Sequence, residues 1–436
     1  MHNKINALPN PDNLPAIAQS DLNVILEKHV MFLRGQVGGQ RLILKYKNLS
    51  DLNFHNHNLS QADFTGSMLV GADLSLGTYS CSCFFACDLR NADLSHANLT
   101  RADLRGSCLS GANLSGANLT DADMREGKIM QSGEGGELVN RKRTAGTGSK
   151  TVLVGARLHN TDMSGVRAPS ADFTDADLSK TITRDANFNG ASFKGANLNR
   201  TDFTGSNLTH ANMQRAILSE TRLDATEHYG MDQTGAITEK DIGKKIEHTG
   251  KTLSQHLKEH TIWVETVGKQ GTRLDLTGYD LRDVQDLRYY HFTAIKAIEA
   301  SFLNLDLSNL ALQSAILDGS DFRDAILQNA DLRGCSLKGC KFTRANLRGI
   351  QLCPLKFDRK GNNNKLQRVD LSGSDLRFAQ LQNADLRDAI LMGVDFSHAD
   401  LSNADLRRAD LTGATINHTI FKNVLLEGAI IDFEYI

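Results

Sequence analysis

The chain has 436 residues, of which 40% are hydrophobic and only 6% aromatic, and its formal net charge is −2. Such a balanced charge gives no global field that favours nucleic acid or another strongly charged partner. Residues 1–19 contain no apolar h-region, so we expect no secretory signal peptide, and the sequence has no run of about 18 apolar residues, which a transmembrane helix requires. We therefore expect a cytoplasmic protein, with a secretion-system effector that lacks a cleavable signal as an alternative.

The N-terminal region divides into a tail and a helix. Residues 1–19 are polar, contain three of the five prolines, and are predicted to form a flexible tail. Residues 21–34 have an amphipathic pattern that predicts a helix, with Ser20 as its N-cap and Gly35 as its C-terminal stop.

From Leu49 to Ile129 a large apolar residue occupies every fifth position, as in Ala92-Asp93-Leu94-Ser95, with one interruption at Tyr79. A small residue lies two positions before the large one, and Asp or Asn lies one before it. A period of five fits neither a straight helix nor a straight strand, because the large residues would not share one face. They all point inward only if the chain turns once per five residues, which indicates a solenoid of stacked repeats.

The spacing of the phenylalanines suggests how many repeats make one coil. Phe302, Phe322 and Phe342 are separated by twenty residues, and the same spacing recurs twice in the first half. Four five-residue sides per coil would stack these rings in columns along the axis.

These repeats resemble the pentapeptide-repeat proteins, whose consensus is A-(D/N)-L-x-x. The resemblance implies an all-β fold, the right-handed quadrilateral β-helix, with the large and small residues inward and the other three outward. It implies no shared activity, since the members of this family are mostly non-enzymatic binders or have no known function.

The same plan occurs twice along the chain. In the first half, a Gly- and charge-rich loop at 131–152 interrupts the repeats, which resume at Leu153 and run to Leu223. Residues 224–251 are polar and irregular and are predicted to be a linker. In the second half, Thr252-Leu-Ser-Gln255 is a capping box that opens a helix to about residue 267. Repeats follow to residue 352, a second basic loop occupies 353–365, and repeats resume at Leu366 and continue to residue 436.

We therefore expect two tandem β-helices, at 20–223 and 252–436, each beginning with a short capping α-helix. The two cap segments match with one residue of length difference, and both contain His-x-x-aromatic followed by an arginine. The predicted cap-junction residues are His29, Phe32, Arg41, His260, Trp263 and Arg273.

The two basic loops occupy matching places in the two halves, which repeat geometry does not require. An anionic partner could dock there, although solvated insertions are often charged as well. The candidate partner-binding residues are Arg141, Lys142, Arg143, Lys150, Lys356, Arg359, Lys360 and Lys365.

The C-terminal segment is too apolar for a free tail. We expect a second copy of the chain to cover it across a two-fold axis, giving a homodimer. The predicted dimer-end residues are Ile431, Phe433, Tyr435 and Ile436.

Aspartates recur on the predicted exterior, which allows two interpretations. They could replace the phosphates of DNA, as in a DNA-mimicking gyrase modulator like the quinolone-resistance members of the family. Alternatively, they bond the local backbone at each turn, and arginines two residues later, such as Arg105 and Arg387, offset their charge. We favour the second interpretation, because a useful field needs an excess of charge.

No residue pattern predicts catalysis or a cofactor. Cys81, Cys83 and Cys87 lack the second pair of ligands that a zinc site needs, so no metal is expected. The sequence has no nucleophile elbow, H-E-x-x-H or Rossmann glycine pattern. We therefore predict a non-enzymatic scaffold that presents rigid β-helical faces to a macromolecular partner.

Overall fold

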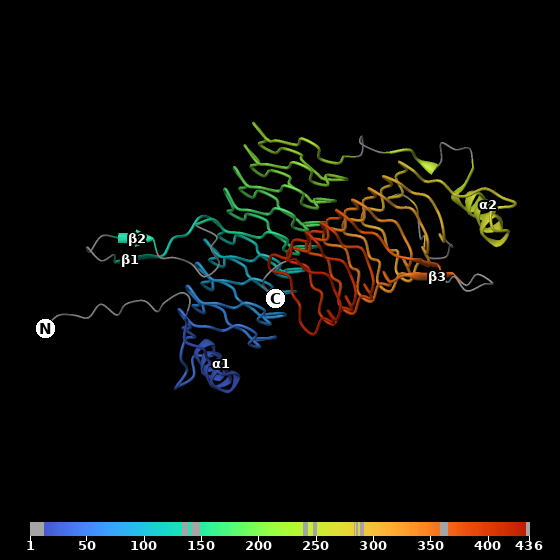
Figure 1. Ribbon diagram of the computed structural model, residues 1–436. Helices are drawn as coiled ribbons and strands as arrows, with labels where there is room; N and C mark the ends of the chain where they lie inside the picture. Colours follow the sequence, from blue (N-terminus) through green and yellow to red (C-terminus); the bar gives the residue numbers. More distant parts are fainter. Residues whose placement is uncertain are drawn as a thin grey trace. The chain divides into compact units, whose positions relative to one another are not determined.

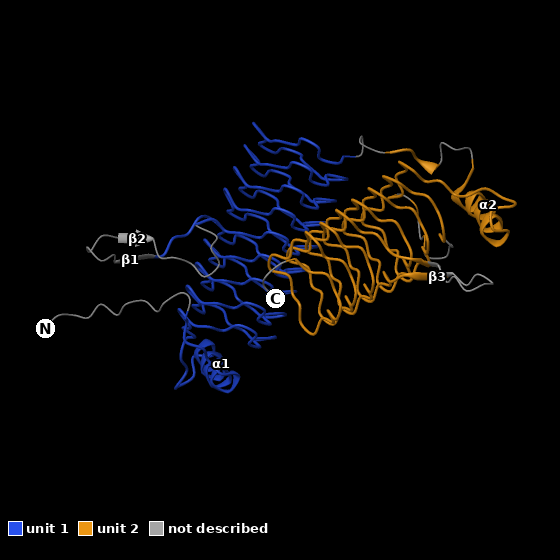
Figure 2. Cartoon of the chain, viewed as in Figure 1, with its two compact units in different colours: residues 1–240 blue, residues 241–436 orange. Residues whose placement is uncertain are grey.

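The computed structural model describes residues 13–132, 138–140, 149–238, 243–246, 251–282, 284, 287, 292–357 and 365–432. The chain forms two compact units, Met1–Lys240 (unit 1) and Asp241–Ile436 (unit 2). Each unit is a stack of coils with a helix at its N-terminal end (Figures 1 and 2). The two units are described separately.

The coils have four sides, and each side pairs with the same side of the next coil. In unit 1, Asn53 pairs in parallel with Asp73, and Asp73 with Asp93, twenty residues further on. The corner follows two residues after each large residue, where the backbone turns into the left-handed region; φ is +57° at Asn91 and +55° at His96. Glycine, asparagine and aspartate tolerate this conformation best, which explains the abundance of glycine.

The large residue of each repeat, called the centre, fills the interior. Leu94, Leu99 and Leu104 are completely buried, and so are the small residues two positions before them. The rings of Phe302 and Phe322 stack with centroids 4.6 Å apart, and the next ring in the column follows at 4.9 Å. The predicted inward pattern and the twenty-residue coil are therefore confirmed.

Helix α1 spans Gln19–Leu33, and its N-cap is Ala18, so the prediction of Ser20 as the cap is wrong. The helix begins earlier because the residues before it are held on the first coil, where the Asn48 N–H donates to the Pro15 carbonyl at 3.0 Å. Residues 13–18 are therefore not a tail, and residues 1–12 lie outside the described part. The expected stop is confirmed, since Gly35 has φ +64°.

Helix α2 spans Leu253–Glu265 and begins with the predicted capping box. The side chain of Thr252 accepts from the Gln255 N–H, and the Gln255 side chain accepts from the Thr252 N–H. These two bonds satisfy two backbone donors that the start of a helix otherwise leaves unpaired.

The predicted linker at 224–251 is wrong in its first part, because the coil continues to residue 238. Glu227, Asp232 and Ile237 each pair with the coil below. The sequence pattern misses this last coil because His228 and Gln233 occupy centre positions, where the repeat calls for a large apolar residue. Residues 239–242 and 247–250 lie outside the described part.

Two β-hairpins interrupt the coils. In unit 1, β1 (Met130–Ser132) pairs antiparallel with β2 (Leu138–Asn140); in unit 2, β3 (Leu355–Phe357) pairs with β4 (Lys365–Gln367). Figure 1 shows β1, β2 and β3 outside the stacks of coils. Both hairpins are insertions between two coils that otherwise stack without a gap.

These insertions correct two predicted centres. Val152 pairs with Cys108, so Leu153 takes the interior place expected for Ile129, which is only partly buried. Leu366 is 54% exposed because it belongs to β4, and the interior sequence resumes at Val369 and Leu371.

Candidate interaction surfaces

The aspartate or asparagine before each centre has a structural role at the turn. Asp73 is typical: its Oδ1 accepts from the backbone N–H of Ser75 at 3.0 Å and from the Ser75 hydroxyl at 2.6 Å. The same contact to the residue two positions later recurs around both units. This geometry agrees with the interpretation that these side chains stabilise the turn.

One side of each unit carries the insertion and is called the hairpin side. In unit 1 it contains Ile43, Asp63, Cys83, Asp103, Asp123, Arg167, Asn187, Asn207 and Glu227. In unit 2 it contains Ala311, Asp331, Gln351, Asp385, Asp405 and Leu425. Both hairpin sides carry a ladder of aspartate–arginine pairs.

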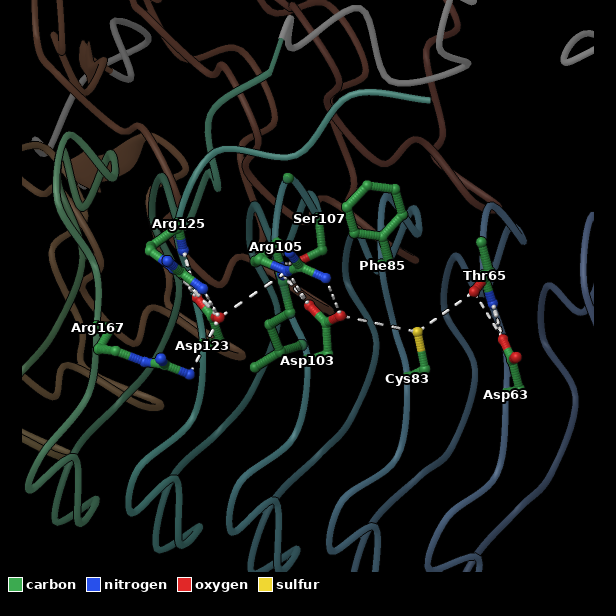
Figure 3. Close-up of polar contacts among 12 residues, drawn as sticks. Asp63, Thr65, Cys83, Phe85, Asp103, Arg105, Ser107, Asp123, Arg125 and Arg167 are labelled. Atoms are coloured by element: carbon green, nitrogen blue, oxygen red, sulfur yellow. Dashed lines mark hydrogen bonds and ion pairs between the residues drawn. The ribbon is translucent and has the colours of Figure 1, made fainter. Parts of the chain in front are cut away.

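In the ladder of unit 1, Arg105 donates from Nε and Nη2 to the two carboxylate oxygens of Asp103, at 2.9 and 2.7 Å. Arg125 donates to the two carboxylate oxygens of Asp123 in the same way, and Arg167 forms an ion pair with the same carboxylate at 3.1 Å (Figure 3). In unit 2 the corresponding pairs, with nearest contacts of 2.6–2.7 Å, are Asp331–Arg333, Asp385–Arg387 and Asp405–Arg407.

The arginines keep the Asp123 carboxylate ionised. Burial alone would raise its pKa, but the hydrogen bonds from Arg125 and the charge of Arg167 outweigh burial and hold the pKa below its usual value. Sequence reasoning missed Arg167 in this group, because the hairpin separates it from Asp123 by 44 residues. The contact could have been predicted by adding the length of the insertion to the twenty-residue spacing between neighbouring coils.

The ladders present alternating charges rather than a negative stripe. Arg105, Arg125 and Arg167 have side chains that are 39–54% exposed, beside carboxylates that are 11–27% exposed. A partner that approaches this side from solvent therefore contacts guanidinium groups at least as readily as carboxylates.

Each predicted basic loop overlaps one of the two hairpins. Lys150 and Lys356 are exposed. Lys365 belongs to β4, and its side chain is outside the described part, as are Arg141, Lys142, Arg143, Arg359 and Lys360. Of the eight predicted partner-binding residues, only Lys150 and Lys356 therefore have side chains that the structure describes, and both lie on the surface.

The hairpins do not leave from equivalent corners. Measured from the cap, Met124 follows Leu42 by 82 residues, whereas Leu352 follows Leu274 by 78. The first coil of unit 2 contains one extra residue, since Asp275 pairs with Lys296. The second hairpin consequently leaves one side earlier than the first, which corrects the expectation of matching places.

The base of each hairpin lies against a glycine corner of the coil below. A Cβ on Gly106 would come within 2.5 Å of the carbonyl oxygen of Gly127, and a Cβ on Gly334 within 3.0 Å of the Leu355 Cβ. The Gln367 side chain also donates to the Gly334 carbonyl at 2.6 Å. These contacts fix where each hairpin begins.

The two caps use the same contacts. His29 and His260 are fully buried, and the Nδ1 atom of each accepts from a backbone N–H, that of Leu42 or Leu274, at 3.0 Å. Each histidine ring also stacks with an aromatic ring at 5.7 Å, Phe32 in one cap and Trp263 in the other.

The predicted arginines bond the coil beneath each cap. Arg41 donates from Nε to the Gln61 carbonyl at 2.6 Å, and Arg273 donates to the Ala294 carbonyl at 2.7 Å. Arg273 also lies over the Trp263 ring at 5.6 Å. In both caps, an arginine therefore ties the capping segment to the coil beneath it.

The ends of the two stacks differ. The last coil of unit 1 has the polar centres His228 and Gln233, both exposed. The last coil of unit 2 has apolar centres that are only partly buried, Ile416, Phe421, Leu426 and Ile431. Of the predicted dimer-end residues, Phe433, Tyr435 and Ile436 lie outside the described part.

The three clustered cysteines of the sequence, Cys81, Cys83 and Cys87, lie in different environments. Cys81 is exposed, Cys83 lies near the Thr65 hydroxyl at 3.3 Å on the hairpin side, and Cys87 is buried with its thiol 3.0 Å from the Phe64 carbonyl (Figure 3 shows Cys83). Within the described ranges, no group of three or more His, Cys, Asp or Glu could hold a metal ion. No described helix is long and apolar enough to cross a membrane.

A family model for pentapeptide repeats matches eight segments that together cover more than half of the chain. The matched residues are 48–76, 82–125, 149–182, 186–224, 306–344, 315–352, 362–391 and 389–428. The chain belongs to the pentapeptide repeat family. Members of this family form right-handed β-helices, which agrees with the four-sided coils described above.

Solved structures of other pentapeptide repeat proteins are similar to parts of this one. A trypsin-treated form of QnrB1, a plasmid-mediated fluoroquinolone resistance protein, is 15% identical over 53% of this chain and 98% of its own, with a TM-score of 0.33. HetL, involved in heterocyst differentiation regulation in the cyanobacterium Nostoc sp. strain PCC 7120, is 22% identical over 93% and 97%, with a TM-score of 0.15. Rfr23 from the cyanobacterium Cyanothece 51142 is 21% identical over 36% and 91%, with a TM-score of 0.19.

Because all three TM-scores are low, these similarities do not support any inference about function. No curated protein matches this pentapeptide repeat protein.

Proposed function

We propose that this pentapeptide repeat protein is a non-enzymatic interaction protein that binds a partner protein through its β-helical faces. The observation that carries the proposal is the pair of aspartate–arginine ladders. Each ladder is held rigid by bidentate bonds, and its arginines stay exposed to a partner. Centres such as Leu94 and Leu381 fill the interior, so the coils offer surfaces rather than a substrate cavity.

The alternating charges favour a protein over a polyanion. A polyanion such as DNA requires a surplus of cations on one face, whereas a protein surface offers both signs. The gyrase-modulating alternative, which follows from the resemblance to the quinolone-resistance members of the family, requires a surplus of carboxylates. Each ladder carboxylate here is offset by its own arginine, which weighs against that alternative.

Affinity capture from the native cell with ladder variants tests the proposal. We expect one partner to be retained by the wild-type protein and lost with Arg387→Ala/Arg407→Ala. Arg200→Ala is the matched control, because Arg200 is an exposed arginine paired with Glu220 away from the ladders. Equal capture by all three proteins would refute the ladder as the binding surface. Inhibition of gyrase supercoiling by the purified protein would favour the gyrase alternative instead.

We infer further that the protein consists of two tandem capped β-helices produced by duplication, and that the end of unit 2 pairs with a second copy. The matching contacts of His29 and His260 support the duplication. Partly exposed apolar centres, including Phe421, support the pairing, because exposed apolar surface is stabilised by burial. We expect a dimer in sedimentation equilibrium at micromolar concentration and a monomer for Phe421→Lys. A wild-type monomer would contradict the pairing.

A further inference from the structure

A cavity of about 210 Å³ lies in the cap of unit 2, between α2 and the first coil. Its floor is apolar and consists of Ile246, Leu274 and Leu276, all less than a tenth exposed. His256 and Glu259 of α2 and Asp275 of the first coil also line it. An apolar floor with a few convergent polar groups is the usual composition of a small-molecule site.

The cap of unit 1 provides an internal comparison. The frames of the two caps match, because the Gln40 N–H donates to the Lys28 carbonyl as the Thr272 N–H does to the Glu259 carbonyl, at 2.9 and 3.2 Å. At four positions that line the cavity, however, the residue types differ. The cap of unit 1 has Ile25, Lys28, Ile43 and Lys47 where the cap of unit 2 has His256, Glu259, Asp275 and Tyr279.

The differences all add groups that can accept a hydrogen bond from a cation. Two carboxylates, an imidazole and a phenol replace two aliphatic side chains and two lysines. Because the cap packing needs none of these groups in unit 1, cap stability alone does not account for them in unit 2.

Both carboxylates already accept an ammonium group. Lys251 Nζ lies 2.6 Å from Glu259, and Lys296 Nζ lies 3.0 Å from Asp275. All four of these side chains are at least 37% exposed, and such surface pairs contribute little to stability. A ligand cation can therefore take the place of either lysine at small cost.

Among the described residues that line the cavity, Arg273 is the one cation. Its guanidinium is directed to the coil, where it donates to the carbonyls of Ala294 and Ile295, at 2.7 and 3.3 Å. These bonds leave the carboxylates of Glu259 and Asp275 as the charged acceptors of the lining.

We propose that this cavity binds an alkylammonium group on a short apolar stem. Glu259 and Asp275 accept the ammonium protons, and Ile246, Leu274 and Leu276 cover the stem. The ligand is either a free amine or the side chain of a lysine in another protein, since both present the same chemistry. This site goes beyond the proposed interaction role and does not depend on it.

The chain carries its own reporter for this site. Trp263 is the only tryptophan, and it lies against Arg273, which lines the cavity. Titration of the full-length protein with n-pentylammonium is expected to give a saturable change in tryptophan fluorescence. The neutral 1-pentanol, which has the same stem, is expected to bind at least tenfold more weakly. A stronger response to Nα-acetyl-lysine amide than to pentylammonium assigns the ligand to a protein lysine, and the reverse assigns it to a free amine.

Variants separate binding from folding. Glu259→Gln/Asp275→Asn is expected to weaken pentylammonium binding at least tenfold, and so is Glu259→Lys/Asp275→Ile, which copies residues that the cap of unit 1 tolerates. Glu265→Gln, on the same helix but outside the cavity lining, is expected to bind as the wild type does. The absence of a saturable signal, an equal response to pentanol, or unchanged binding in both double variants would overturn the proposal.

Discussion

Lowering the pH from 7.5 to 5.0 is expected to destabilise unit 2 through His260. This histidine is fully buried, its Nδ1 accepts from the Leu274 N–H at 3.0 Å, and its Nε2 lies 2.9 Å from the Thr293 carbonyl. With the Leu274 N–H donating to Nδ1, the ring is neutral and carries its proton on Nε2. A second proton on Nδ1 would break the bond to Leu274.

The sign of the effect follows from the pKa. Burial lowers the pKa of His260, the bond to Thr293 partly opposes this, and the charge of Arg273 lowers it further. The unfolded chain binds a proton near pH 6.5, whereas the folded cap resists it, so stability is full above pH 6.5 and falls as the pH drops below it. If the ring stays neutral in the folded state, the loss at pH 5.0 is at most about 2 kcal/mol.

Urea denaturation followed by Trp263 fluorescence measures this loss, because the ring of Trp263 stacks with that of His260. With a urea dependence of about 2 kcal/mol per molar, the midpoint is expected to fall by up to about 1 M between pH 7.5 and 5.0. His260→Gln keeps a neutral acceptor, so its midpoint should not move over this range. His418→Gln, which changes an exposed histidine, should behave like the wild type. An equal pH shift in His260→Gln and the wild type would refute the reasoning.

Five further substitutions test the interior and the hairpin contacts by urea denaturation. Tyr79→Phe should raise the free energy of unfolding by about 1 kcal/mol, because the Tyr79 hydroxyl is buried without a hydrogen-bond partner; Phe84→Tyr should lower it. Leu381→Ala should lower the free energy of unfolding by about 2–5 kcal/mol, because Leu381 is a buried centre. Leu366→Ala should lower it by less than about 0.5 kcal/mol, and a loss as large as that of Leu381→Ala would show that Leu366 is a centre. Gly106→Ala should cost more than about 1 kcal/mol, because φ is +60° and the new Cβ would meet a carbonyl oxygen; no loss would place the hairpin base elsewhere.

The regular part of the fold could be predicted from the sequence because one interaction dominates it. Every fifth residue must be buried, so Leu94 and Leu381 identify the coil without any knowledge of its neighbours. The two capping helices were also predictable, since the capping box of α2 and the repeated His-x-x-aromatic pattern are local signals, whereas the start of α1 depends on the contact of the preceding residues with the first coil. Both features depend on residues that lie close together in the sequence.

The sequence failed where the position of a residue depends on distant parts of the chain. Ile129 and Leu366 continue the apolar pattern, yet each is displaced because the chain leaves the coil for a hairpin before it can close another side. His228 and Gln233 break the pattern, yet the coil continues because backbone bonds to the coil below remain available. The ladder contact between Asp123 and Arg167 was hidden for the same reason.

The difference between the ends of the two β-helices follows from the residues that occupy the centre positions of each last coil. The last coil of unit 1 pairs its backbone with the coil below, but its centres include the polar His228 and Gln233, so burying that end removes less apolar centre surface from water. The last coil of unit 2 has Phe421 and Ile431 in the same role, and a further layer would bury them. Because the gain from burial is about 25 cal/mol per Å² of apolar surface, we expect the second end to favour association more than the first. A polar centre therefore acts as a stop for stacking, and its absence marks the end that is expected to pair.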